Sequence, residues 1–290
     1  MDYGGLVKRA LDVMWKFKYL WIFGFFLEFG SGGGSWFFNL PEKIKLPVGD
    51  FIRYDFLEGV LVGAIVLLVM AALVIFLVFL IMYIISQGGL VHSVWRVSTG
   101  GNPALRDGWD AGLRNFWRVL GIKVIIIIFI LGSILITLAP FVLILIAFKL
   151  MGVISGLILF PLLLVLIVVI ALVDLYGTRA CVIEGKGVFD SLGAGWNMLK
   201  SNPGPSLIVA LIGIGSTLVY IFAFVAVGLL LVLPFVAVAA FNLFFGIVAG
   251  ILVGLLYIGV VSALWGTYID SLWTLAYLDM KKLQPQKAAV

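Results

Sequence analysis

The chain has 290 residues, of which 64% are apolar and only 11% are charged, and its mean hydropathy is +1.25. Soluble domains carry about a quarter charged residues, so the composition excludes a soluble globular fold and indicates a membrane protein. The net charge of +5 does not indicate nucleic-acid binding, because multi-span membrane proteins retain Lys and Arg on the cytoplasmic side.

The first 58 residues predict an amphipathic helix, a short apolar segment and a polar loop. Residues 3–18 place apolar side chains on one helical face and charged side chains on the other. Residues 19–38 are rich in aromatic side chains and form the weakest predicted span, because Glu28 interrupts them. A secretory signal segment is the alternative here, although the Trp and Phe content favours a retained segment. Prolines and glycine predict a loop at 39–58.

Long apolar runs predict the remaining spans, and their only charge is Lys149 in the run 124–173. Residues 60–85 form one span, and residues 124–173 and 206–264 are each long enough for two, because ~20 apolar residues cross a bilayer. We expect turns near residues 149–152 and 234–242, with Pro140 and Pro161 kinking or ending helices. Residues 265–282 close the chain with an expected aromatic belt, formed by Trp265, Tyr268, Trp273 and Tyr277.

Two polar islands between the spans predict further amphipathic helices. Asn102-Pro103 is typical of a helix start, and residues 103–123 alternate apolar and charged side chains at helical spacing. In the second island Asn202-Pro203 ends the helix, and an apolar stripe runs along it through Phe189, Leu192, Trp196 and Leu199. A short amphipathic helix beside a span should lie in the interface, with its Trp at headgroup level.

Three tryptophans suggest an internal repeat. Trp15, Trp117 and Trp196 each follow a Leu by four residues, and each precedes a pair of apolar spans. We interpret them as interfacial anchors of a helix-plus-hairpin unit, repeated over residues 1–86, 103–183 and 187–280. The alternative is that cytoplasmic loops are amphipathic without being repeats. The expected fold is one all-α integral membrane domain over residues 1–290, with about six transmembrane helices and short amphipathic interfacial helices.

The distribution of basic residues predicts the topology. With six spans, 15 of the 19 Lys and Arg residues lie on alternate segments that include both termini. The positive-inside rule therefore predicts that both termini are cytoplasmic.

Two motif windows carry a family resemblance. The first is Trp15-Lys16-Phe17-Lys18-Tyr19-Leu20-Trp21-Ile22-Phe23-Gly24, and the second runs from Asp174 through Val182-Ile183-Glu184-Gly185-Lys186-Gly187 to Trp196. The chain resembles prokaryotic multi-pass proteins related to the membrane domain of glycerophosphodiester phosphodiesterases. The resemblance implies an all-helical bundle in a prokaryotic inner membrane. It does not imply phosphodiesterase activity, because the catalytic barrel of that family is a separate soluble domain.

Asp174, Arg179 and Glu184 are the candidate functional polar residues, since ionisable groups near membrane depth are often functional. Structural pairing is the alternative for them, and Asp270, among interfacial aromatics, is the weaker candidate. One Cys and one His exclude an intramolecular disulfide and a His- or Cys-based metal cluster, so we expect no metal and no cofactor. Gly246, Gly250 and Gly254 are spaced for close helix packing, within the chain or between two copies.

No protease or phosphate-loop motif is complete, so we expect no catalytic residues. The preferred hypothesis is a non-enzymatic scaffold, assembly factor or regulatory partner. Its interfacial helices would contact the lipid bilayer, including anionic lipids, and a membrane-protein partner or second copy, but not nucleic acid. The alternatives are a transporter or channel for a small solute, and a lipid-active enzyme that uses Asp174 and Glu184 at the cytoplasmic face.

Overall fold

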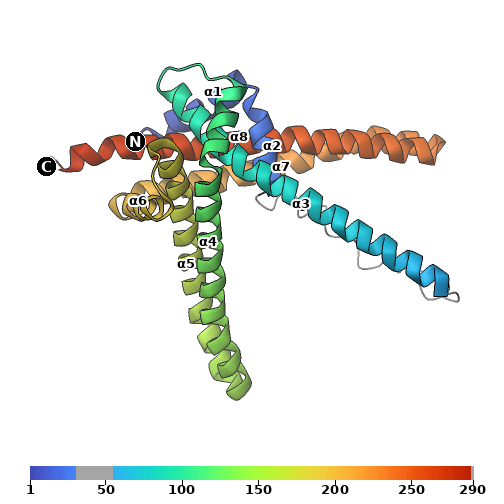
Figure 1. Ribbon diagram of the computed structural model, residues 1–290, viewed down its shortest axis with the longest axis horizontal. Helices are drawn as coiled ribbons and strands as arrows, with labels where there is room; N and C mark the ends of the chain where they lie inside the picture. Colours follow the sequence, from blue (N-terminus) through green and yellow to red (C-terminus); the bar gives the residue numbers. More distant parts are fainter. Residues whose placement is uncertain (31–54, 289–290) are drawn as a thin grey trace.

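The protein is all-helical in the computed structural model, which describes residues 1–30 and 55–288. The described residues form the following helices: α1 (Tyr3–Lys16), α2 (Leu20–Gly30), α3 (Asp55–Ser98), α4 (Leu105–Ala147), α5 (Lys149–Glu184), α6 (Val188–Ser201), α7 (Pro203–Phe241) and α8 (Leu243–Ala288). Figure 1 shows that α3, the α4–α5 pair and the α7–α8 pair leave a common centre in different directions.

Among the described residues, five helices are long and apolar enough to cross a membrane. They are Gly63–Ser98, Leu105–Ile146, Val153–Glu184, Pro203–Phe241 and Leu243–Lys282. The sixth predicted span is not confirmed: α2 has 11 residues, which cover only about 16 Å, and residues 31–38 lie outside the described part of the chain. The predicted loop at 39–58 also lies mostly outside it, but α3 already begins at Asp55.

Several helices are longer than a bilayer requires. The 44 residues of α3 and the 46 residues of α8 reach about 66 to 69 Å, whereas the hydrocarbon core measures about 30 Å. The part of the long helices that a bilayer core does not require lies at the common centre of the fold, together with α1, α2 and α6. We call this centre the hub, and it comprises α1, α2 and α6 with residues 83–98, 105–126, 170–184, 203–213 and 262–282. The rest of each long helix is an apolar arm.

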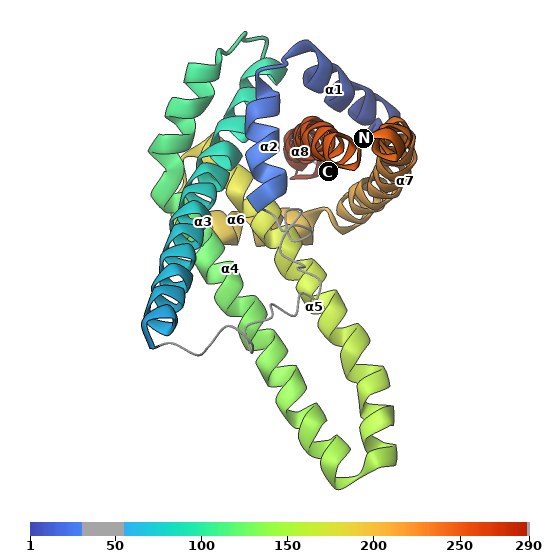
Figure 2. The same ribbon diagram turned by 90° about the vertical axis from the view of Figure 1, so that its right-hand side faces the viewer.

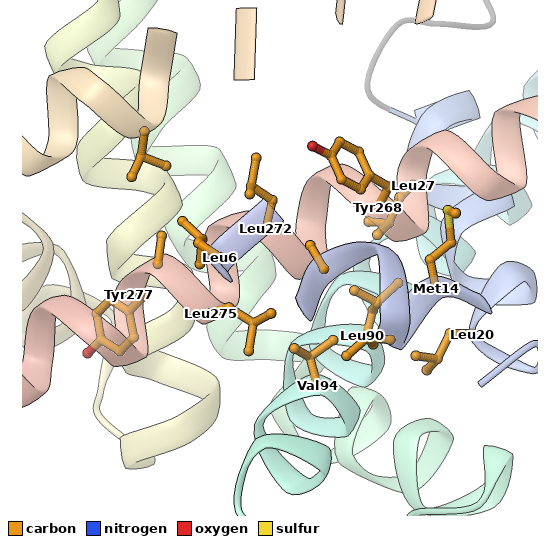
Figure 3. Close-up of a cluster of buried hydrophobic side chains, with 14 of the residues drawn as sticks. Leu6, Met14, Leu20, Leu27, Leu90, Val94, Tyr268, Leu272, Leu275 and Tyr277 are labelled. Carbon is orange, nitrogen blue, oxygen red and sulfur yellow. The ribbon is translucent and has the colours of Figure 1, made fainter. Parts of the chain in front are cut away.

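The core of the hub surrounds the C-terminal half of α8. In Figure 2, which looks along α8, α1, α2 and α7 lie around it. Leu6 of α1, Leu20 of α2 and Leu272 of α8 are fully buried, and each such side chain stabilises the fold by roughly 1.5–3 kcal/mol. Figure 3 shows them beside Leu90 and Val94 of α3. The arms, in contrast, expose most of their apolar side chains.

Glycines let the helices of the hub approach closely. A Cβ on Gly266 of α8 would lie 2.2 Å from the carbonyl oxygen of Gly24 in α2, so the two backbones touch. Thr267 then donates a hydrogen bond to the carbonyl oxygen of Leu20 at 3.1 Å. Gly185 ends α5 with φ of 68°, a backbone conformation that favours glycine.

The predicted glycine stripe on α8 contributes to the α7–α8 pair at two of its three positions. A Cβ on Gly246 would lie 2.6 Å from Ala239 in α7, and one on Gly250 would lie 3.4 Å from Phe235. A Cβ on Gly254 would meet nothing within 4 Å. Nearer the hub, Tyr257 donates a hydrogen bond to the Phe224 carbonyl oxygen at 2.6 Å.

Local predictions were right at several helix ends. The two hairpins break at Phe148 and Asn242, beside or within the predicted turns, and α6 ends before Asn202-Pro203 as expected. Pro140 and Pro161, however, lie inside α4 and α5 and do not end them.

Two predictions near the hub were wrong. The amphipathic segment 103–123 is not a separate interfacial helix, because α4 runs on from Leu105 into its apolar arm. That helix starts two residues after Pro103, and Asp107 accepts a hydrogen bond from the Ala104 amide at 2.8 Å. The expected aromatic belt at 265–282 is also not an exposed belt, since Tyr268 and Tyr277 are buried in the hub.

Candidate functional site

Asp174 lies at the hub end of α5 and is paired with α4. Its carboxylate accepts a hydrogen bond from the Lys123 ammonium at 2.6 Å, and both side chains are largely shielded from solvent. The hydroxyl of Thr178, one turn further along α5, also donates to Asp174 at 3.4 Å. The pair therefore ties α4 to α5 where their uncharged runs end.

Arg179 is the most deeply buried charge of the hub. Its side chain is only 2% exposed, and its guanidinium donates to the Asp270 carboxylate of α8 at 2.6 Å. It also donates to the backbone carbonyl oxygens of Leu175 and Asp270, at 2.8 and 3.3 Å. Because a buried charge is costly without a counter-charge, Asp270 stabilises the buried position of the Arg179 side chain and so joins α5 to α8.

Glu184 closes α5 with three partners. Tyr277 of α8 donates a hydrogen bond to its carboxylate, and the ammonium groups of Lys186 and Lys281 lie 2.8 Å away. Lys186 is close in sequence, but Tyr277 and Lys281 belong to α8. Glu184 thus joins the end of α5 to the C-terminal part of α8.

The three predicted polar residues therefore do not converge on one site. Asp174, Arg179 and Glu184 follow one another along α5, and each is engaged by a different partner from α4 or α8. No group of three or more His, Cys, Asp or Glu side chains suited to a metal ion occurs in the described ranges. This arrangement holds α5 to α4 and to α8.

The three predicted tryptophan anchors remain at the surface of the hub. Trp15, Trp117 and Trp196 are 56%, 77% and 50% exposed, and they lie on α1, α4 and α6. Trp15 packs edge-to-face with Trp21, whose indole N–H donates to the Met14 carbonyl oxygen at 2.9 Å.

A groove of about 420 Å³ lies between α1, the turn after α3 and the end of α8. Arg9 and Asp279 meet in its wall at 2.5 Å, and this hydrogen bond raises the pKa of the Arg9 guanidinium. Apolar side chains, among them Val13, Phe17 and Leu275, contribute to its lining. None of the predicted site residues lines it, and sequence reasoning missed it because its walls come from three segments that are far apart in the sequence.

Sequence reasoning also underrated Asp270. A usable signal was present, because Arg179 and Asp270 are isolated charges of opposite sign near the ends of apolar runs. Such charges are costly alone and therefore tend to be paired.

No protein-family model, curated protein or solved structure matches this chain. The architecture is that of a multi-pass membrane protein, with five helices able to cross the bilayer within residues 1–30 and 55–288. The family resemblance of the two motif windows stays a prediction.

Proposed function

We propose that this chain is a non-enzymatic scaffold, assembly factor or regulatory partner of a prokaryotic inner membrane. The main support for this proposal is the pairing of the charged side chains in the hub. The candidate polar residues are joined in ion pairs between α4, α5 and α8, while the helical arms present apolar surface. A rigid hub with diverging apolar arms suits the binding of neighbours in the membrane better than turnover of a substrate.

The same geometry supports a cytoplasmic hub. α1 and the C-terminal part of α8 meet at the Arg9–Asp279 pair, so both ends of the described chain lie at the hub (Figure 1). Most Lys and Arg residues of the described chain lie in or next to the hub, whereas Lys149 lies at the tip of the α4–α5 hairpin. The positive-inside rule places such an end in the cytoplasm.

Six crossings fit this placement. Gly30 of α2 lies beside Tyr83 at the hub end of α3, whereas α3 begins at Asp55, about 42 Å away along its axis. The described chain thus ends α2 at one end of α3 and resumes at the other, which supports six crossings. Reporter fusions at residues 1 and 290 should both be active in the cytoplasm, and reporters on opposite faces would refute this topology.

The alternatives receive less support. In the arms, Ser133 and Thr217 donate to the carbonyl oxygens of Phe129 and Gly213 on their own helices, not into a shared pathway. Asp174 and Glu184, the carboxylates of the lipid-enzyme hypothesis, are held by lysines of the hub.

The function is tested by flux measurements and native purification together. Liposomes that contain the purified protein should show no specific flux across ion and metabolite panels. Purification in mild detergent should recover a membrane protein in a fixed stoichiometric ratio. Saturable flux of one solute would overturn the scaffold proposal in favour of a transporter. An activity on lipid that is lost in Asp174→Asn would overturn it in favour of an enzyme.

A further inference from the structure

The buried face of α6 contains no aromatic side chain, and the aromatic rings of this helix lie on its outer side. Ser191, Gly195 and Met198 are buried against the hub. A Cβ on Gly195 would lie 2.5 Å from the carbonyl oxygen of Val173 in α5, so only glycine permits this contact. Phe189 is 77% exposed, and it lies with Trp196 on the opposite side of the helix. These two aromatic rings are therefore surface features and not core.

The contacts of α6 fix its depth relative to the apolar arms. Gly195 lies against α5 at Val173, the residue before Asp174, which is the first charge after the apolar run. At its other end, Val188 lies against Gly121 of α4, about 4.5 Å along the axis from Val124, where the uncharged run begins. In Figure 1 α6 is seen end-on beside the α4–α5 arm, so it runs across that arm. α6 thus lies at the boundary between charged hub and apolar arm.

The adjacent part of α4 adds a tryptophan and two arginines at nearly the same depth. Trp117 precedes Val124 by seven residues, about 10 Å, and this is within reach of the headgroup region. Arg114 and Arg118 flank it, and Arg118 donates to the carbonyl oxygen of Gly185 at 3.2 Å, which joins α4 to the end of α5, three residues before α6 begins. Lys200 contributes a further exposed cation near the C-terminal end of α6.

The charge along α4 changes sign with distance from the arm. The acids Asp107 and Asp110 lie 17 and 14 residues before Val124, about 21 to 26 Å from the apolar run. The positions closer to it are basic. Asp190, in the first turn of α6, is the acid that stands beside this surface. A surface with exposed aromatic rings and an excess of cations complements an anionic bilayer surface.

We infer that the aromatic–basic surface formed by Trp117, Phe189, Trp196, Arg114, Arg118 and Lys200 binds anionic phospholipid headgroups of the cytoplasmic leaflet. The inference rests on the proposed function, in which the hub faces that leaflet. The rings enter the boundary between headgroups and acyl chains, and the cations contact lipid phosphates. Each cation near an anionic membrane surface strengthens binding about fivefold.

The test uses the full-length protein in a neutral detergent, titrated with short-chain phosphatidylglycerol or phosphatidylcholine and read by native mass spectrometry. The double variant Arg114→Gln with Arg118→Gln should lose phosphatidylglycerol affinity by about tenfold or more, because it loses charge-assisted contacts to the lipid phosphate, with phosphatidylcholine binding unchanged. The control is Arg106→Gln, which removes one positive charge from the same helix at a 91% exposed side chain, far from the proposed surface. It should retain wild-type affinity, and thermal midpoints equal to that of the wild type should show that both variants are folded.

Equal phosphatidylglycerol affinity in the double variant and in wild type would overturn the inference. Equal losses in the double variant and in Arg106→Gln would overturn it too, because they indicate a general charge effect. Competition by free glycerol phosphate as effective as by the lipid would point to a soluble phosphate site and also refute it. Since this titration needs no membrane orientation, its result is independent of the reporter and flux experiments that test the proposed function.

Discussion

Replacing Asp270 by Asn should destabilise the hub more than any exposed charge change. The substitution keeps the size of the side chain but leaves the Arg179 guanidinium, 2% exposed, without its counter-charge at 2.6 Å. Breaking a buried pair from one side costs about 3–5 kcal/mol. We expect the lower end, about 3 kcal/mol, because Arg179 keeps its hydrogen bonds to two backbone carbonyl oxygens.

The assay is thermal unfolding in detergent at one fixed scan rate, since membrane proteins often unfold irreversibly. At about 2 °C per kcal/mol for a chain of this size, the midpoint should fall by about 6 °C. Arg106→Gln, which removes an exposed pair with Asp110 at 3.8 Å, should change it by less than about 1 °C.

A double-variant cycle tests the cause of this loss. Arg179→Met combined with Asp270→Leu removes both charges, and such apolar replacements of a buried pair are often neutral or stabilising. The double variant should therefore be more stable than either single one. If the two single losses simply add, or if Asp270→Asn behaves like Arg106→Gln, the ion pair does not hold α5 to α8 and the reasoning fails.

Three further predictions use the same unfolding assay. Gly195→Ala should lower the midpoint, because its Cβ would lie 2.5 Å from a carbonyl oxygen of α5 and overpacking costs about 1–3 kcal/mol. In the same helix, a Cβ on Gly193 would meet nothing within 4 Å, so Gly193→Ala should raise the unfolding midpoint slightly. Equal midpoint shifts in Gly195→Ala and Gly193→Ala would contradict the α5–α6 contact. Gly266→Ala should separate α2 from α8 and destabilise by a similar amount, whereas Gly254→Ala should not; an unchanged midpoint for Gly266→Ala would exclude the close approach. Lys123→Met should lower the free energy of unfolding by about 1–3 kcal/mol, because the partly buried Asp174 then keeps Thr178 as its hydrogen-bond donor but loses its counter-charge. A loss of stability as large as that of Asp270→Asn would refute the idea that the more deeply buried ion pair contributes more.

The wrong prediction of a separate helix at residues 103–123 shows one limit of structure prediction from an amino-acid sequence. A change from charged to apolar composition near Lys123 suggested two helices, but the structure has one. Backbone hydrogen bonds within a helix do not depend on the solvent around it, and no proline interrupts the chain there. The change in composition therefore marked the position at which the surroundings of α4 become apolar, and it did not mark the end of a helix.

The α6 helix shows a second limit. Its periodicity was read correctly as a helix, and its apolar stripe predicted which face carries Phe189 and Trp196. Which face packs against the hub could not be predicted, because small residues such as Gly195 give no hydropathy signal. The complementary surface, at Val173 and Gly177, belongs to another helix.

The amino-acid sequence by itself indicated a multi-pass membrane protein, and it determined where the long apolar runs lie and approximately where the hairpins turn, next to Phe148 and at Asn242. These properties depend on local composition and on the length that a bilayer requires. Only the tertiary structure decided that Arg179 pairs with Asp270, 91 positions away, and that Tyr277 reaches Glu184. Partners of this kind are set by how separate helices pack, and no local pattern along a single chain encodes that geometry.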